Sequence, residues 1–158
     1  MADIRVGIGV DAHALEDGVQ LVLGGVELDH PRGLAGHSDG DVLAHALIDA
    51  LLGAAGLGDI GSLFPSMDER FRGVSSLVLL KEAYAQVREA GWMLVNADCV
   101  LVGEEPRLAP HRDEMRHRLQ EAIGEGEVNV RATTTDSLGF TGRGEGLAAH
   151  AVALLERR

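Results

Sequence analysis

Apolar residues follow two different spacings in the first third of the chain. Residues 4–10 alternate between apolar and small or polar types, as in a half-buried strand. Residues 20–23 and 26–28 flank Gly24-Gly25, a two-residue hairpin signal. Between positions 42 and 54 apolar residues recur every three to four positions, which predicts a helix with a broad buried stripe. We expect its N-cap at Ser38, with Asp41 completing a capping-box-like pair.

The same two spacings continue through the rest of the chain. A helix is expected after a cap at Ser76, with its stop at Gly91, followed by a long strand over 92–102. Pro110 favours the first turn of another helix, and residues 128–132 alternate as a strand. A last helix is predicted from about Leu147 to Glu156. Together they indicate one α/β (α+β) domain over residues 1–158, a mixed sheet of four or five strands with helices on one face.

Composition excludes several classes of protein. With 46% hydrophobic and 25% charged residues, the 158-residue chain has an ordinary globular balance. We expect no membrane span, because no apolar run approaches roughly 20 residues, and no signal peptide, because the N-terminus lacks its basic and apolar regions. A net charge of -11 without a basic cluster argues against nucleic-acid binding. The single Cys99, expected in the core, cannot form an intrachain disulfide and favours a cytoplasmic location.

Three residues from two elements form a candidate metal site. In an extended segment Asp11 and His13 point the same way, since they lie two residues apart. His45 lies on one face of the expected helix, between Asp41 and Asp49. Taken alone, His45 is most simply an ordinary buried histidine. With Asp11 and His13 it completes a three-ligand set that leaves zinc an open position, although composition alone identifies no metal.

A second candidate site follows the strand at 128–132. That strand runs into three threonines and Asp136, then into a glycine-spaced loop over 139–146 that opens the expected last helix. Exposed N–H groups and a helix N-terminus favour anions, and Arg143 would add a forked donor for phosphate. The spacing is neither a P-loop nor a dinucleotide fingerprint. The alternative is that these glycines only serve tight turns.

Several motifs occur together, in order, over nearly the whole chain. They are Asp11-Ala12-His13, residues 37–41 with His45, Leu51 to Gly61, Phe64-Pro65, Ala132 to Thr135 and Gly139 to Gly146. As a set they closely resemble the 2-C-methyl-D-erythritol 2,4-cyclodiphosphate synthases. The resemblance implies a lyase of the non-mevalonate pathway to isoprenoids and terpenoids. Such an enzyme converts 4-diphosphocytidyl-2-C-methyl-D-erythritol 2-phosphate into the cyclic diphosphate and CMP.

The resemblance also implies roles for individual residues. Asp11, His13 and His45 would hold one zinc ion per subunit. Asp136 would lie near a second divalent ion, magnesium or manganese, on the substrate diphosphate. His37 and Thr134 would stabilise the transition state. The implied assembly is a homotrimer with its active sites between subunits, acting on a small cytidine diphosphate substrate.

The residues implied to contact the substrate come from five segments of the chain. They are Asp11, Ala12 and His13; His37 and Ser38; Asp59, Ile60, Gly61, Phe64, Pro65, Ser66, Met67 and Asp68; Gly103, Glu104, Glu105, Pro106, Arg107, Leu108 and Ala109; and Thr133, Thr134, Thr135, Asp136, Phe140 and Arg143.

Several residues depart from the family pattern or have simpler explanations. Ser66 stands where many relatives have aspartate, Asp136 replaces the commoner glutamate, and Val10 stands where an aromatic is common. Glu104 and Glu105 replace less charged residues, and we expect both carboxylates to point to solvent. Asp41 is interpreted as a helix cap, and Asp49 as a solvated or trimer-facing carboxylate. Arg143 and Glu145 resemble residues at the threefold axis, which either flank an anion pocket or form an intersubunit salt bridge.

Two other functions remain open from the sequence. A zinc phosphohydrolase would use the same three ligands to activate water and cleave a phosphate ester. A non-catalytic trimer could instead bind isoprenoid diphosphates around a purely structural zinc, which would call for a fourth protein ligand.

Overall fold

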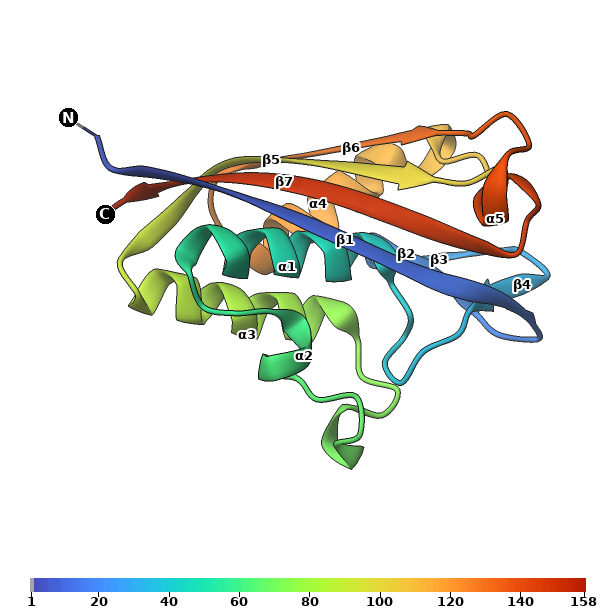
Figure 1. Cartoon of the computed structure of the whole chain (residues 1–158), viewed down its shortest axis with the longest axis horizontal. Coiled ribbons are helices and arrows are strands. Elements are labelled where there is room, and N and C mark those ends of the chain that lie inside the picture. Colours follow the sequence, from blue (N-terminus) through green and yellow to red (C-terminus); the bar gives the residue numbers. More distant parts are fainter. Residues whose placement is uncertain (1) are drawn as a thin grey trace.

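A five-stranded mixed sheet forms one layer of the structure (Figure 1). The computed structural model describes residues 2–158. The strands are β1 (Ile4–Asp17), β4 (Arg32–Leu34), β5 (Trp92–Val102), β6 (Glu127–Thr133) and β7 (Gly146–Arg157). Their order is β4-β1-β7-β5-β6, with β5 and β6 parallel and the other pairs antiparallel. The predicted mixed sheet in a single α+β domain is confirmed.

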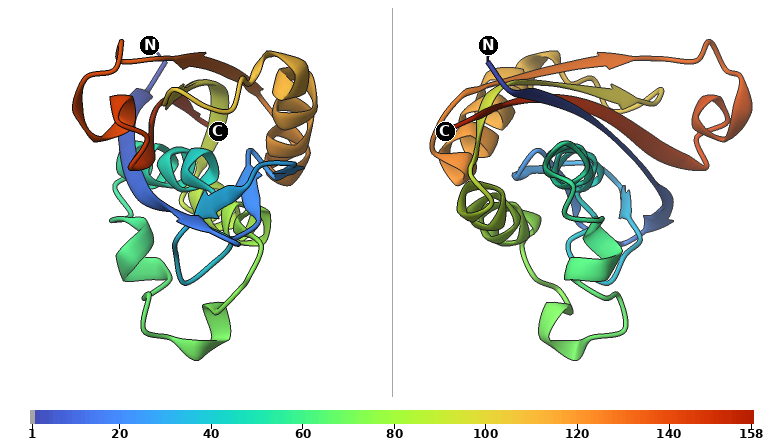
Figure 2. Two further views of the ribbon diagram at one scale, coloured as in Figure 1. Left: turned by 90° about the vertical axis from the view of Figure 1, so that its right-hand side faces the viewer. Right: turned by 60° about the vertical axis from the view of Figure 1, so that its left-hand side comes forward.

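Three long helices cover one face of this sheet (Figures 1 and 2). They are α1 (Val42–Ala55), α3 (Ser76–Glu89) and α4 (Arg112–Ile123). The sheet curls around α1, whose residues are almost all buried. The predicted hairpin forms as β2 (Leu21–Leu23) and β3 (Val26–Leu28). The short elements are α2 (Ile60–Leu63), η1 (Glu69–Phe71), η2 (Ala109–His111) and α5 (Gly139–Gly142).

Glycines in β1 allow α1 to approach the sheet very closely. A Cβ atom on Gly9 would lie 1.8 Å from the carbonyl oxygen of Ala46, and one on Gly7 would lie 2.1 Å from that of Ala50. No side chain fits at such distances, so the two backbones are in direct contact. Gly9 lies two residues before Asp11, and Ala46 follows His45. This contact therefore holds Asp11 and His13 on β1 in a fixed position relative to His45 on α1.

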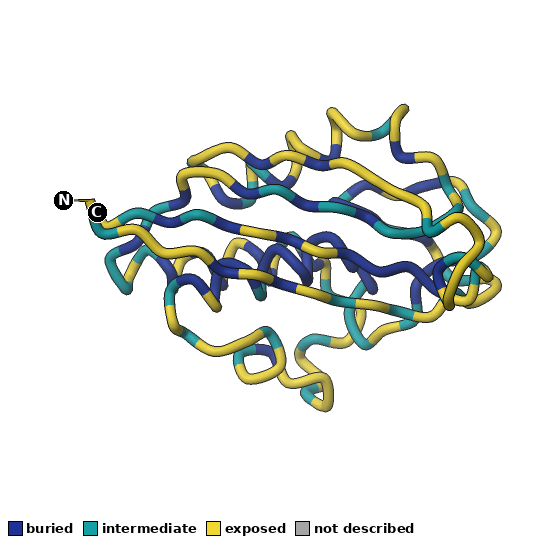
Figure 3. The backbone as a smooth tube through the Cα atoms, turned by 45° about the horizontal axis from the view of Figure 1, so that its top comes forward, coloured by how far each residue is buried: buried dark blue, intermediate teal, exposed yellow. Residues whose placement is uncertain are grey.

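The opposite face of the sheet carries an open apolar row. Ile4, Val6, Ile8 and Val10 point away from α1 and are 54–68% exposed. Val152 on the neighbouring strand β7 is 45% exposed. Figure 3 views this face, where exposed and buried residues alternate along the strands. An uncovered row of β-branched residues is typical of a surface that another chain covers.

The predicted last helix is wrong, because residues 146–157 form the central strand β7. The odd-numbered residues from Leu147 to Leu155 are all buried against the helices. Its alanines and leucines favour a helix locally, yet β7 pairs along its whole length with both β1 and β5. The small side chains also leave room for α1. Since no long helix opens after the glycine loop, the predicted helix-N-terminus phosphate cradle is also wrong.

Two predicted helix caps are displaced. The N-cap of α1 is Asp41 and not Ser38, while α3 is capped by Ser75 and not Ser76. Asp41 is fully buried and accepts N–H donors from Ala44 at 3.1 Å, Gly24 at 2.9 Å and Gly25 at 2.7 Å. It therefore joins the hairpin turn to the start of α1, which confirms its interpretation as a cap.

Two further expectations from composition concern the core and the membrane. Cys99 is fully buried, as predicted, and burial raises the pKa of its thiol to about 12. Among residues 2–158, no helix combines the length and the apolar character that a bilayer crossing requires.

Candidate metal centre and substrate pocket

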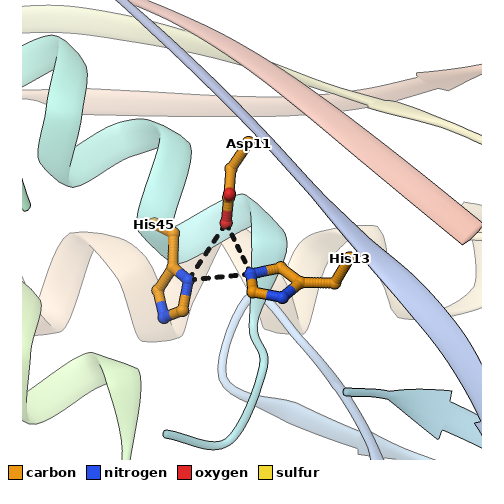
Figure 4. Close-up of side chains that lie close together, drawn as sticks. All are labelled: Asp11, His13 and His45. Carbon is orange, nitrogen blue, oxygen red and sulfur yellow. Dashed lines mark hydrogen bonds and ion pairs between the residues drawn. The ribbon is translucent and has the colours of Figure 1, made fainter. Parts of the chain in front are cut away.

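Asp11, His13 and His45 meet as predicted, at the place where β1 crosses the first turn of α1 (Figure 4). The Asp11 Oδ2 atom lies 2.8 Å from His13 Nε2 and 3.0 Å from His45 Nδ1. The two imidazole nitrogens are 3.3 Å apart. Strand alternation directs Asp11 and His13 toward the helix, and α1 presents His45 to them.

The spacing of these three atoms fits a tetrahedral metal ion. Zinc bonds to nitrogen and oxygen are about 2.0–2.2 Å long, so two ligand atoms of a tetrahedron lie about 3.3–3.5 Å apart. The observed separations, 2.8–3.3 Å, are slightly shorter. Two facing imidazole nitrogens and a carboxylate suit a borderline-soft divalent ion. The three residues would thus hold a metal ion after a small relaxation.

The charge state of the cluster also suits a metal ion. Burial by itself would raise the pKa of Asp11, but hydrogen bonds with His13 and His45 lower it well below its usual value. The hydrogen bond with Asp11 raises the pKa of His13 above 6.5, against the opposing effect of burial. Asp11 is therefore anionic at neutral pH, and a metal ion would compete with a proton for His13.

The triad forms part of a pocket of about 380 Å³. Predicted substrate residues line the rest of it, together with two apolar side chains that the sequence did not single out, Phe71 and Leu79. The predicted ones are His37, Ser38, Ile60, Gly61, Phe64, Pro65, Ser66 and Met67. The rings of Phe64 and Phe71 meet edge to face at 5.3 Å between centroids. Their apolar wall would limit the access of water to whatever binds at the triad.

His37 is held in this pocket by the loop that closes it. Its Nε2–H donates to the backbone carbonyl of Asp68 at 2.7 Å. Its own carbonyl accepts the N–H of Gly73 at 2.7 Å. Because the Nε2–H of His37 already donates to the loop, the ring can donate a second hydrogen bond to an anion only if Nδ1 also carries a proton.

Asp49 and Asp59 hold α2 in place beside the pocket. The Asp59 carboxylate caps α2 by accepting the Ser62 N–H at 2.8 Å, and it remains exposed. The Asp49 carboxylate accepts the Ile60 N–H at 2.7 Å. Asp49 is half-buried and fastens α1 to α2, so it is not simply a solvated carboxylate, while the alternative that it faces a partner subunit stays a prediction.

The remaining predicted residues lie elsewhere in the chain. Within one chain β7 and β5 separate β1 from β6, so the turns that follow β5 and β6 do not line the triad pocket. Arg143, Glu104 and Glu105 line a different cavity of about 180 Å³ with Arg32. Ala12 points to the other face of β1 and is exposed.

The turn after β6 is exposed and conformationally unusual. Thr133, Thr134 and Phe140 are exposed, and Asp136 and Ser137 have positive φ angles of 52° and 66°. The N–H of Ser137 donates to the Glu104 carboxylate at 2.7 Å, and the other Glu104 oxygen is buried with no hydrogen-bond partner among residues 2–158. The expectation that Glu104 points to solvent is wrong, because it ties the two turns together. Glu105 is exposed as expected. Arg143 pairs with Glu145 at 2.9 Å within the chain.

Three comparisons with known proteins give one consistent result. Residues 4–156 match the model of the YgbB family. A 2-C-methyl-D-erythritol 2,4-cyclodiphosphate synthase of Moorella thermoacetica is 56% identical over 154 residues, covering 96% of this chain and 94% of the relative.

Solved structures agree with the family match. A CDP-bound structure of 2C-methyl-D-erythritol-2,4-cyclodiphosphate synthase is 41% identical, with a TM-score of 0.87 over 96% of this chain and 99% of that one. The bifunctional IspDF of Campylobacter jejuni is 42% identical, with a TM-score of 0.96 over 100% of this chain and 43% of that one.

Proposed function

Because the chain belongs to the YgbB family of 2-C-methyl-D-erythritol 2,4-cyclodiphosphate synthases, we propose that it forms this cyclic diphosphate and releases CMP. The substrate is 4-diphosphocytidyl-2-C-methyl-D-erythritol 2-phosphate. An oxygen of the 2-phosphate attacks the β-phosphorus in line, and the bond from that phosphorus to the oxygen of CMP breaks. The observation that carries the proposal is the three-ligand cluster at the wall of a pocket of about 380 Å³.

The chemical difficulty is charge repulsion between the two phosphates that must join. A divalent ion bound by Asp11, His13 and His45 would supply Lewis acidity and positive charge beside the phosphate oxygens. We propose zinc there, since two imidazoles and one carboxylate leave it an open position. The chain itself supplies orientation: β1 and α1 hold the ligands rigidly, and Ser38 and His37 place polar groups beside them.

The loop that carries Phe64 and Phe71 has a separate role in this proposal. Its apolar wall would pack against the methylerythritol part of the substrate and exclude water from the reacting phosphates. Exclusion of water favours cyclisation over hydrolysis, because the internal 2-phosphate is then the only nucleophile within reach. Gly61 lines the pocket and Asp59 caps α2 beside it, and both would contact sugar-like hydroxyl groups of the substrate.

We also propose that the active enzyme is a homotrimer, with the cytidine site supplied by a neighbouring subunit. The apolar row of β1 gives each chain a surface to cover, and self-association would cover it. The turns around Glu104 and Asp136 would then meet the triad pocket of the next chain. Asp136 would approach a magnesium or manganese ion on the diphosphate, and Thr134 the developing charge. The cytoplasmic location expected from the single cysteine stays a prediction.

Phosphorus NMR of the purified protein with the cytidine diphosphate substrate, zinc and magnesium tests the proposal. We expect CMP and a cyclic diphosphate to appear together, and neither to appear after chelation. Intact substrate, or linear phosphates alone, would contradict it. In water enriched in oxygen-18 a phosphohydrolase would label its product, whereas cyclisation leaves the product unlabelled.

A further inference from the structure

The ring of His45 makes a second set of contacts on the side away from the triad. Its Nδ1 faces Asp11 and His13, and its Nε2 points the opposite way (Figure 4). There Nε2 lies 2.8 Å from the hydroxyl of Ser76 and 3.1 Å from that of Ser38. Ser76 is fully buried at the first position of α3, 31 residues from His45 in sequence.

Ser76 is in turn held by the carboxylate of Asp39. The Ser76 N–H donates to Asp39 Oδ2 at 2.9 Å, and the Ser76 hydroxyl makes a short hydrogen bond to Asp39 Oδ1. Asp39 is fixed by its neighbours as well, since its N–H donates to the Val74 carbonyl at 3.1 Å. Its Oδ1 atom also accepts the Asp41 N–H at 3.1 Å.

The chemistry of Asp39, Ser76 and His45 sets the direction of the hydrogen bonds that join them. A carboxylate only accepts, so the single hydroxyl proton of Ser76 goes to Asp39. The Ser76 oxygen then presents only lone pairs to His45, which must donate its Nε2–H. A neutral imidazole carries one N–H, so Nδ1 keeps a free lone pair, and that lone pair faces the metal site.

We propose that Ser76 and Asp39 are positioning residues that hold His45 in the tautomer whose Nδ1 binds the metal ion. This inference rests on the proposed metal centre and adds two residues to it, neither of which is one of its three ligands. Partners of this kind fix the orientation of a metal-bound imidazole and raise its basicity. Asp39 precedes α1 and Ser76 begins α3, so their hydrogen bonds link the metal site to the start of α3.

Zinc affinity, measured by competition with a chromogenic chelator, tests the inference without substrate. Ser76→Ala removes the acceptor for His45 and should weaken zinc binding by about tenfold, since Ser38 remains as a second acceptor. Ser75→Ala is the matched control, because it deletes the neighbouring hydroxyl, which only caps α3. Asp39→Asn keeps the side-chain size, removes one acceptor and should also weaken zinc binding. Circular dichroism spectra report whether each variant remains folded.

The imidazole N–H signals of the zinc-loaded protein provide a second readout. Wild-type protein should show a slowly exchanging proton on His45 Nε2, because a buried hydroxyl accepts it. In Ser76→Ala this signal should shift and exchange faster, while Ser75→Ala should leave it unchanged. A purely structural role for Ser76 would not move it selectively.

Each outcome separates the inference from the proposed function. If Ser76→Ala binds zinc within twofold of wild type, or if Ser75→Ala weakens zinc equally, the positioning role is wrong while the metal centre stands. If wild-type protein binds no zinc, the metal centre and the positioning role both fail. Selective weakening in Ser76→Ala, with the shifted N–H signal, supports the inference.

Discussion

The two groups of predicted site residues are held by the chain in very different ways. Asp11 and His13 stand on β1, and His45 stands on the buried helix α1, whose backbone touches that of β1. The turns near Glu104 and Asp136 are largely exposed and lie across two strands from the triad. Within a single chain the two groups lie apart and do not line one pocket.

This difference separates two requirements of the proposed reaction. Metal ligands must keep their geometry to within fractions of an ångström, so they are placed where packing allows no movement. The residues proposed to bind cytidine must admit and release a nucleotide, and turns at a sheet end can adjust. The apolar row of β1 is the feature that would bring the two groups together in a trimer.

Loss of a metal ligand should have the largest effect on activity. It should remove metal binding and leave the turns near Glu104 and Asp136 unchanged. His45→Ala removes one of three ligands, so we expect little bound zinc and roughly 1000-fold less CMP release, equivalent to several kcal/mol of transition-state stabilisation. The protein should remain a folded trimer. His117→Ala, which alters a side chain that is 77% exposed, is the control. Full activity in His45→Ala would overturn the metal assignment.

A charge in the apolar row of β1 should instead disrupt the trimer and leave metal binding within each chain intact. Ile8→Lys loses about 1.5–3 kcal/mol of burial in each of three copies, which weakens assembly of the trimer by roughly 1000-fold or more. Sedimentation should show monomers that still bind zinc but release no CMP. Val78→Lys changes an equally apolar side chain, 55% exposed on α3, and should stay trimeric and active. Active monomers of Ile8→Lys would show that one chain contains a whole site.

A methyl group at the contact between β1 and α1 should affect stability and metal binding together. Gly9→Ala places Cβ against the carbonyl of Ala46, so we expect the free energy of unfolding to fall by about 1–3 kcal/mol and zinc to bind more weakly. Gly53→Ala, within α1, is the matched control because its Cβ meets only the Ile8 carbonyl oxygen, at 3.9 Å. That variant should be unchanged or slightly more stable. Denaturant unfolding of both variants measures the difference.

The sequence predicted the triad because each half of it follows a local rule. Alternation along a strand pairs Asp11 with His13, and helical spacing places His45 among buried residues. It mispredicted β7, since a run of alanine and leucine favours a helix until two neighbouring strands pair with it. Ser76 and Asp39 were missed as functional residues because their contact with His45 depends on how loops far apart in sequence fold together.

Acidification should have the smallest effect, and we expect it to weaken metal binding through protonation of His13. Asp11 stays ionised near neutral pH because its pKa is lowered, whereas that of His13 is raised above 6.5. Zinc binding requires deprotonated His13, so affinity should be full above the raised pKa and fall about tenfold per pH unit below it. The metal-free protein should show the opposite trend: the ion pair of protonated His13 with Asp11 stabilises it below pH 6.5, and this contribution disappears as pH rises through the raised pKa. Chelator competition and thermal unfolding between about pH 5.5 and 8 would measure both trends. A flat zinc affinity across this window would show that His13 does not bind the metal through the nitrogen that faces Asp11.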